Sequence, residues 1–310
     1  MSSQPIALQR EVVPSGPFSL QAAAEFGFGP NEGRPAPFDG AMRLAFPVDG
    51  GVGYAGAVLR QPEPDGPVGI ELWLRDGASA QAALAQVTRV VSLDFDGRDF
   101  ARVGERDPVI GRLQREYPGQ RPVLFHSPYE GAAWSIISAR RPSAQAARVR
   151  EAIGAQHGET FELAGHTLLA FPQPDRLAGI GDAFPGLSAD KLLRLRGVAD
   201  AALQGRLDVA HLHALGPEAA YTEIQTLKGL GPFYAGLVVL RASGFADATL
   251  GMAEPKVLAH AARFYELPQP PTLERFAELA EAWRPFRTWC TVLIRLGGDR
   301  AFGPVRGARR

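Results

Sequence analysis

The stretch from residue 225 to residue 241 holds the residues with the clearest chemical potential, a glycine-rich turn followed by proline and an apolar run. Gly229 and Gly231 predict a turn too tight for a side chain, and Pro232 is typical of the first position of a helix. Amide groups at such a helix start point outward, and the helix dipole favours an anion there. The pattern indicates a phosphate-binding turn, and an ordinary connection between two helices fits this short stretch equally well.

The composition predicts a globular protein with a large core. Of its 310 residues, 45% are hydrophobic and 21% are charged. A chain of this length typically forms two or three domains. The sequence contains no apolar run of about 18 residues and begins without a signal-peptide pattern, so we expect a cytoplasmic protein without contact to a membrane. Basic and acidic residues number 33 each, so any contact with nucleic acid must come from local patches.

The cysteines and histidines do not form a metal-binding pattern. Cys290 is the only cysteine, which excludes an internal disulfide, a zinc ribbon and an iron–sulfur cluster. His211 and His213 are two residues apart and do not share a face of a helix, so we interpret them as surface or capping residues. The sequence therefore predicts no transition-metal site.

The apolar spacing changes character along the chain. Residues 41–48, 53–60 and 68–75 alternate partly as strands do, and residues 78–92 fit a helix or a strand. From about residue 105 the spacing is helical, and prolines, serines and aspartates stand at several helix starts. The predicted helices cover residues 108–116, 128–139, 142–154, 188–203, 209–215, 216–226, 232–243, 255–265 and 272–296, the last with a break near Pro285. The prediction is an α+β chain in which a β-rich domain precedes a helical body.

Several segments in a fixed order resemble the DNA-3-methyladenine glycosylase II (AlkA-like) branch of the helix-hairpin-helix DNA glycosylase superfamily. The resemblance covers most of the chain and rests on the order and spacing of its motifs. Apart from the hairpin, these are residues 18–20, 90–94, 107–111, 117–122, 127–139, 171–172, 187–194 and 283–288.

The resemblance implies the fold and the partner. Residues 1–104 are expected to form a TATA-binding-protein-like antiparallel sheet domain of mixed α/β type. Residues 105–310 are expected to form an all-helical glycosylase core of two subdomains with a cleft between them and the helix-hairpin-helix at about residues 217–243. The partner is then double-stranded DNA with a damaged base, flipped out of the helix for its bond to be cut. We expect a monomer associated with the nucleoid.

The resemblance also assigns the grip on DNA to the hairpin. Its contacts with the DNA backbone are expected from Gly229, Leu230, Gly231 and Phe233. A monovalent cation, Na⁺ or K⁺, is expected on the backbone carbonyls of Gln225, Leu227 and Leu230, with no other cofactor. Such contacts position a protein on DNA without reading its sequence.

Two arginines stand where the family carries its intercalating side chain. Arg140 and Arg141 follow the segment that resembles the first helix of the core. An arginine can stack in the gap left by a flipped base and can reach phosphate, which favours a wedge role. Two solvated arginines on a loop are the alternative.

Glu254 occupies the position at which the family carries its catalytic aspartate. Cleavage of an N-glycosidic bond develops positive charge on the sugar, so the site needs a carboxylate that stabilises this charge and orients or activates water. Glu254 directly precedes Pro255 and is expected at a helix start. Three hypotheses remain: Glu254 is the catalytic acid, Asp247 or another acid replaces it, or the protein does not cleave.

The expected base pocket departs from the family pattern. Its positions hold Phe233, Leu237, Pro255, Trp289 and Arg295. Aromatic rings attract cationic alkylated purines, whereas Arg295 would repel them if it points into the pocket, so the substrate can differ from 3-methyladenine. Trp289 and Tyr234 are candidates for pocket rings and for core residues alike. Phe233 stands where bifunctional relatives carry a lysine nucleophile, which predicts a monofunctional enzyme.

These inferences lead to one main hypothesis and two alternatives. The main hypothesis is a monofunctional DNA glycosylase of base excision repair that removes an alkylated or otherwise damaged base. The first alternative is a non-catalytic helix-hairpin-helix protein that binds damaged or bent DNA. The second is a structural or protein-binding module unrelated to DNA.

Overall fold

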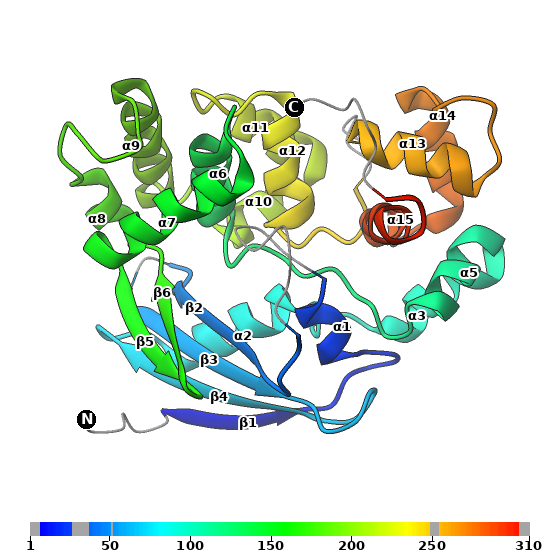
Figure 1. The fold of residues 1–310 in the computed structure, drawn as a ribbon, viewed down its shortest axis with the longest axis horizontal. Coiled ribbons are helices and arrows are strands. Elements are labelled where there is room, and N and C mark those ends of the chain that lie inside the picture. Colours follow the sequence, from blue (N-terminus) through cyan, green and yellow to red (C-terminus); the bar gives the residue numbers. More distant parts are fainter. Residues whose placement is uncertain (1–6, 27–36, 51, 249–253, 304–310) are drawn as a thin grey trace.

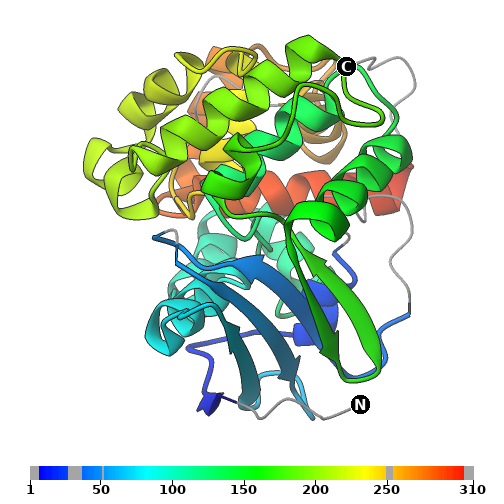
Figure 2. The same ribbon diagram turned by 90° about the vertical axis from the view of Figure 1, so that its left-hand side faces the viewer.

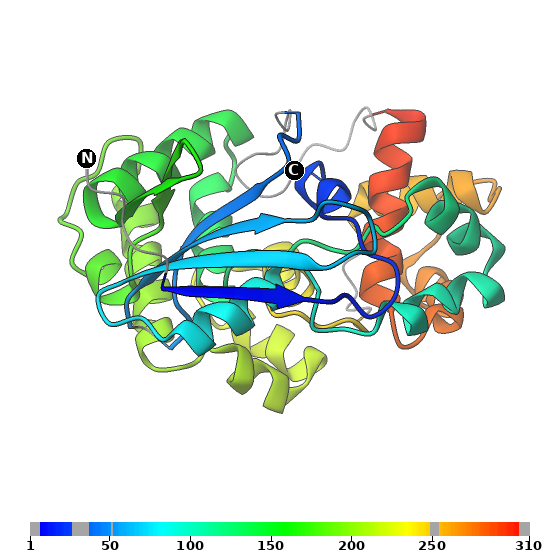
Figure 3. The ribbon, with the colours of Figure 1, turned by 90° about the horizontal axis from the view of Figure 1, so that it is seen from below.

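A four-stranded antiparallel sheet lies on one side of a body of helices (Figure 1). The computed structural model describes residues 7–26, 37–50, 52–248 and 254–303. Figure 3 shows the strands side by side in the order β1-β4-β3-β2. Their bounds are β1 Leu8–Val12, β2 Met42–Pro47, β3 Tyr54–Arg60 and β4 Val68–Arg75. The three strands predicted between residues 41 and 75 are confirmed, and β1 is an addition to them.

The two faces of this sheet are covered by different elements. Helices α1 (Leu20–Ala24) and α2 (Ala80–Val90) share a hydrophobic cluster with one face, to which β3 contributes Ala55, Ala57 and Leu59. Tyr54 and Val58, at alternate positions of the same strand, belong to a second cluster on the other face. This alternation is the period of two that a strand imposes, and it places a core on each side of the sheet.

The second cluster contains a β-hairpin from the middle of the chain, which corrects the prediction of an all-helical region after residue 105. Strands β5 (Glu159–Leu163) and β6 (His166–Ala170) pair in antiparallel fashion. Phe161 and Leu163 are buried against the sheet, whereas Glu162 between them is exposed. Figure 2 shows this hairpin extending from the helices down to the sheet. The pattern is the same alternation that indicated β2 to β4, in a segment too short to stand out beside the long helices.

The helices predicted after residue 105 begin within about one residue of their predicted starts, whereas three short helices at residues 97–101, 103–106 and 174–178 are additions. Proline occupies the first turn of α5, α6, α8, α11, α12 and α13, and side chains of Asp107, Ser127, Ser188 and Thr272 cap α5, α6, α9 and α14. The amino-terminal and central helices are α3 Gly97–Ala101, α4 Val103–Arg106, α5 Pro108–Glu116, α6 Pro128–Ser138, α7 Ser143–His157, α8 Pro174–Ala178 and α9 Ala189–Leu203. The others are α10 Val209–Leu215, α11 Pro217–Gln225, α12 Pro232–Arg241, α13 Pro255–Phe264, α14 Leu273–Ala280 and α15 Arg287–Phe302, with a 3-10 turn at Glu281–Trp283. None of the described helices has the length and apolar character needed to cross a membrane.

The helices pack around two hydrophobic clusters. The first joins α6, α7 and α9 to α12, and the second joins α5 to α13, α14 and α15. Within the second, Asp107 accepts hydrogen bonds from Trp283 Nε1 at 2.8 Å and from the Tyr265 hydroxyl at 2.6 Å. This links the segments at residues 107–111 and 283–288, which are separate motifs of the resemblance. The combination of a small antiparallel sheet with a helical body agrees with the predicted α+β class, while the TATA-binding-protein-like arrangement of the sheet stays a prediction.

Arg121 connects the amino-terminal segment to the helical body. Its side chain is 2% exposed. Burial lowers the pKa of its guanidinium to about 10. The guanidinium donates hydrogen bonds of 2.7 to 3.1 Å to the backbone carbonyls of Ser15, Gly16, Pro17, Ser92 and Phe95. These carbonyls lie in two separate segments of the chain, so one side chain holds both in place.

Replacing Arg121 with methionine should lower the free energy of unfolding by about 3 to 5 kcal/mol, because it leaves a set of buried carbonyls without donors. Urea denaturation measures this change. The control is Arg102→Met, since Arg102 is exposed and pairs with Asp99 at the surface, a contact worth below about 1 kcal/mol. Equal losses in the two variants would contradict the role assigned to Arg121.

Candidate functional site

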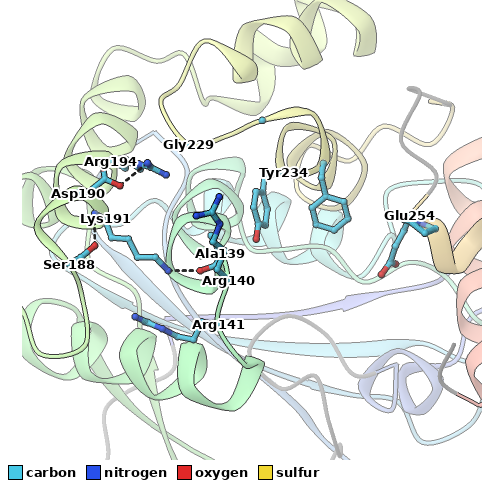
Figure 4. A pocket seen from close by; sticks show the side chains of 13 residues that line it. Ala139, Arg140, Arg141, Ser188, Asp190, Lys191, Arg194, Gly229, Tyr234 and Glu254 are labelled. Carbon is cyan, nitrogen blue, oxygen red and sulfur yellow. Dashed lines mark hydrogen bonds and ion pairs between the residues drawn. The ribbon is translucent and has the colours of Figure 1, made fainter. Parts of the chain in front are cut away.

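A cavity of about 930 Å³ lies among four loops and helix starts (Figure 4). They are the turn after α6, the start of α9, the hairpin between α11 and α12, and the start of α13. The lining residues include Arg140, Arg141, Ser188, Asp190, Lys191, Arg194, Gly229, Gly231, Phe233, Tyr234, Glu254 and Pro255. The predicted wedge turn, hairpin and catalytic position, which are far apart in the sequence, therefore surround one space.

The hairpin depends on Gly229. This residue has a φ of +97°, and a Cβ built on it would lie 2.8 Å from Arg194 Cδ and 2.9 Å from Ile136 Cδ1. A side chain here would be strained in its backbone and would collide with α6 and α9. The turn is closed by a hydrogen bond of 3.0 Å from the Leu230 N–H to the Leu227 carbonyl.

The structure corrects the reason given for Gly231. This residue has a φ of −69° and a ψ of −177°, angles that any residue adopts, and a Cβ added to it would meet no atom of the described residues within 4 Å. The fold therefore does not require glycine at this position, and the space beside it is open. Gly231 is the N-cap of α12, and it has no side chain to cap the helix. The first amide groups of α12 face a space that an anion can approach closely.

The wedge turn is held by Lys191. The Lys191 ammonium donates hydrogen bonds of 2.8 Å to the carbonyls of Ile137 and Ala139, at the end of α6. The Arg141 guanidinium donates to the Gly186 carbonyl, whereas Arg140 is exposed, with a φ of +56°. Of the two predicted wedge residues, Arg140 is exposed at the cavity and Arg141 is tied to the loop before α9.

One wall of the cavity carries excess positive charge. Among the described residues it combines Arg140, Arg141, Lys191 and Arg194 with a single carboxylate, Asp190, which pairs with Arg194 at 2.7 Å. Burial, together with the charges of Arg141 and Arg194, lowers the pKa of Lys191 to about 8. This wall is therefore a local basic patch, of the kind on which any contact with nucleic acid must depend in a chain of neutral composition.

Glu254 lies on the opposite side of the cavity from Lys191 and Arg194, and Tyr234 lies between them in Figure 4. It is the N-cap residue of α13, but its side chain does not cap the helix. Its Oε2 atom instead accepts a hydrogen bond of 2.9 Å from Arg295 Nε on α15. Arg295 also pairs with Asp299, and Asp299 Oδ1 lies 3.0 Å from Nε2 of the buried His260. No sequence pattern indicated this chain of contacts, because it joins two helices about 40 residues apart.

A second cavity, of about 90 Å³, adjoins the first and shares Phe233 and Glu254 with it. Its other lining residues are Leu237, Leu240, Arg241, Val257, Thr288, Thr291, Val292 and Arg295. Three of the predicted pocket residues, Phe233, Leu237 and Arg295, therefore line this space, and Pro255 lines the larger cavity.

Two of the candidate site residues lie outside these cavities. Trp289 lines neither of these cavities, because it is buried in the second helical cluster, with its ring 5.0 to 5.4 Å from those of Phe95, Phe100 and Phe286. Asp247, the alternative acid, is also outside both cavities. It accepts hydrogen bonds from Arg284 and Arg287 at the start of α15, so it serves the packing of that helix.

His211 and His213 are both exposed, in agreement with their interpretation as surface residues. His213 Nε2 lies 2.7 Å from the Ser243 carbonyl, and its ring stacks on Phe245. Within the described parts of the chain, no three His, Cys, Asp or Glu side chains gather as a metal ion would require.

Comparisons with known proteins agree on the fold. The DNA-3-methyladenine glycosylase of Bacillus subtilis is 21% identical over 206 residues, which are 65% of this chain and 67% of that protein. No family model matches the chain. The 3-methyladenine DNA glycosylase from Archaeoglobus fulgidus has a TM-score of 0.75 at 21% identity, over 96% of this chain and 100% of that one. For the Clostridium acetobutylicum 8-oxoguanine glycosylase/lyase in complex with double-stranded DNA, the TM-score is 0.64 at 15% identity, over 95% and 98%.

The chain therefore has the fold of the helix-hairpin-helix DNA glycosylases. The resemblance to the 3-methyladenine branch of that superfamily, first seen in its sequence motifs, is confirmed by a relative and by a solved structure that carry this name.

Gly229 and Gly231 form a matched pair for testing the hairpin. Gly229→Ala should lower the free energy of unfolding by about 1 to 3 kcal/mol, because of its left-handed backbone and the collision with α6 and α9. Gly231→Ala should change it by less than about 1 kcal/mol. Thermal and urea unfolding measure both variants. Equal stability of the two would show that the turn does not have the described conformation.

Proposed function

We propose that the protein is a monofunctional DNA glycosylase of base excision repair, with Glu254 as its catalytic acid. The observation that carries the proposal is the position of the Glu254 carboxylate, in a cavity that it shares with the hairpin and the basic wall. In this proposal the partner is double-stranded DNA with one damaged base, and the protein acts on it as a monomer at the nucleoid.

The grip on DNA is assigned to the hairpin and the basic wall. The open space beside Gly231 and the uncapped start of α12 favour a phosphate there. Lys191 and Arg194 add positive charge at the same cavity. Such contacts are independent of sequence and hold the backbone in register. They supply the fixed point against which a nucleotide can be rotated out of the helix.

The hairpin carbonyls of Gln225, Leu227 and Leu230 are the proposed ligands of a monovalent cation. Carbonyl oxygens are the ligands that replace the water shell of such ions. The Leu227 oxygen accepts one hydrogen bond within the turn and keeps a second lone pair for a ligand. A cation there would add positive charge beside the phosphate.

Arg140 is the proposed wedge. It is exposed at a turn that Lys191 holds by a hydrogen bond to the Ala139 carbonyl, and it lines the cavity together with the hairpin. A guanidinium plane can stack on the bases that remain when one is flipped out. Arg141, which is bonded to Gly186, supports the turn rather than entering the DNA.

The proposed chemistry is hydrolysis of the bond between base and sugar. The damaged base leaves with the bonding electrons, positive charge develops on the sugar, and the Glu254 carboxylate stabilises that charge and orients the attacking water. As the new C–O bond forms, the water gives a proton to the carboxylate, which passes it on to the departed base. Arg295 binds Oε2 and holds the carboxylate in place, whereas Oε1 has no partner among the described residues and can face the water. Phe233 stands at the position of the lyase lysine, which supports a reaction without strand cleavage.

Glu254→Gln should slow base release by at least about 100-fold, because the amide carries no negative charge to stabilise the sugar. Release of bases from methylated and deaminated duplexes is measured together with binding, which the variant should retain. The matched control is Glu278→Gln, which also removes a glutamate paired with an arginine but lies on α14 outside both cavities. If the parent binds duplex without releasing a base, the non-catalytic alternative holds; equal release by parent and Glu254→Gln removes Glu254 from the mechanism.

Binding of duplex should weaken as the pH rises from 7 to 9. Because the pKa of Lys191 is lowered to about 8, its ammonium is charged at pH 7 and largely neutral at pH 9, so the basic wall loses one positive charge. We expect a two- to fivefold increase in Kd, roughly the effect of one partly exposed charge. Lys191→Arg should remove this part of the pH dependence, since arginine stays charged. A pH profile of duplex binding that is identical in the parent and in Lys191→Arg would contradict the role assigned to Lys191.

A further inference from the structure

Arg295 holds Glu254 through Nε in the proposed reaction, and it also gives the smaller cavity a donor, Nη2, that this reaction does not use. It is one of the lining residues, together with apolar side chains from α12, α13 and α15. Of the residues that the structure describes, Phe233 is the only one to contribute an aromatic ring to that lining. A pocket with one ring and an arginine is poorly suited to hold a cation through aromatic faces.

The charges around this cavity also disfavour a cationic base. Arg241 and Arg295 both line it, and Glu254 is the one carboxylate among the lining residues that the structure describes. Asp299 pairs with Arg295 but is not in the lining of either cavity. The lining itself thus has two arginines and one carboxylate, and Asp299 offsets part of the charge of Arg295 from behind.

The remaining N–H groups of Arg295 favour an acceptor on the base. A guanidinium has five N–H donors in a fixed plane. In Arg295, Nε is taken by Glu254 and Nη1 faces Asp299, whereas Nη2 has no partner among the described residues. A base with a carbonyl oxygen can accept from this group. A base without an acceptor would leave the donor unpaired on closing the pocket, which costs binding free energy.

We infer that the pocket selects an uncharged damaged base that presents a carbonyl oxygen, such as a deaminated purine, and that Arg295 determines this selectivity. The inference rests on the proposed function, because it takes the smaller cavity beside Glu254 as the place of the flipped base. It departs from the cationic alkylated purines for which aromatic-lined pockets are suited.

The test compares three duplexes that differ in the lesion. One contains hypoxanthine, which is neutral and has a carbonyl; one contains ethenoadenine, which is neutral without a carbonyl; one contains 7-methylguanine, which is cationic. A 2′-fluoro sugar at the lesion blocks cleavage, so competition binding reports the pocket alone. The parent should bind the hypoxanthine duplex at least about tenfold more tightly than the other two.

Arg295→Met should abolish this preference, because it removes both the charge and the donors. Arg295→Lys should keep the discrimination against 7-methylguanine and lose that against ethenoadenine, and it serves also if the methionine variant folds poorly. Arg263→Met is the control, since Arg263 lies on the neighbouring helix α13 against the Phe302 ring and lines neither cavity. It should leave the preference unchanged.

The outcomes separate this inference from the proposed function. Tightest binding to the 7-methylguanine duplex, or an undiminished hypoxanthine preference in Arg295→Met, overturns the inference. Base release from the same lesions on ordinary sugars is measured in parallel. If the protein releases bases but shows no preference for the hypoxanthine duplex, the proposed glycosylase function stands and the proposed selectivity is wrong. If it prefers the hypoxanthine duplex but releases no base, the proposed selectivity stands and the catalytic role of Glu254 is wrong.

Discussion

The close approach of Gly229 to α6 and α9 is the contact on which the cleft depends. A turn without a side chain can lie directly against Ile136 and Arg194. The same two helices supply the wedge turn, at the end of α6, and Lys191, at the start of α9. Since Lys191 bonds the last carbonyls of α6, the hairpin, the wedge turn and the basic wall are packed as one unit. Their relative positions then follow from core packing, which tolerates little displacement.

Glu254 belongs to a different helical cluster, and its position is set by a charge pair. A carboxylate at the edge of a cavity needs a partner when water is displaced from it. Arg295 supplies that partner at 2.9 Å, and Asp299 with His260 behind it supports the guanidinium. The arginine that orients the proposed acid also lines the adjoining pocket, so the proposed catalysis and the proposed selectivity depend on the same side chain.

Local signals predicted most of the helices, because proline and capping residues act within one turn. The same signals could not reveal how helices meet. Thr288, Val292 and Arg295 follow the spacing of three to four residues along one face of α15 and line the smaller cavity. Trp289, one residue further than Thr288, points about 100° away and is buried in the core. The sequence does not show which face of this helix points to the cavity, so a shift of one residue separates a pocket residue from a core residue. The pairing of Glu254 with Arg295 could not be predicted either, because it depends on how two helices pack.

The overall composition is neutral, yet one wall of the cavity is positive, because Asp190 is the one carboxylate among the described residues of that wall. Elsewhere on the surface arginines pair with acids, as Arg43 does with Asp39 and Arg275 with Glu278. Such pairs cancel at distances beyond the screening length of about 8 Å. Arg141 and Lys191 donate to backbone carbonyls instead, which leaves their charge uncancelled. A field built in this way attracts phosphates of any sequence, so the proposed function assigns discrimination between damaged and intact DNA to the cavities beyond the wall.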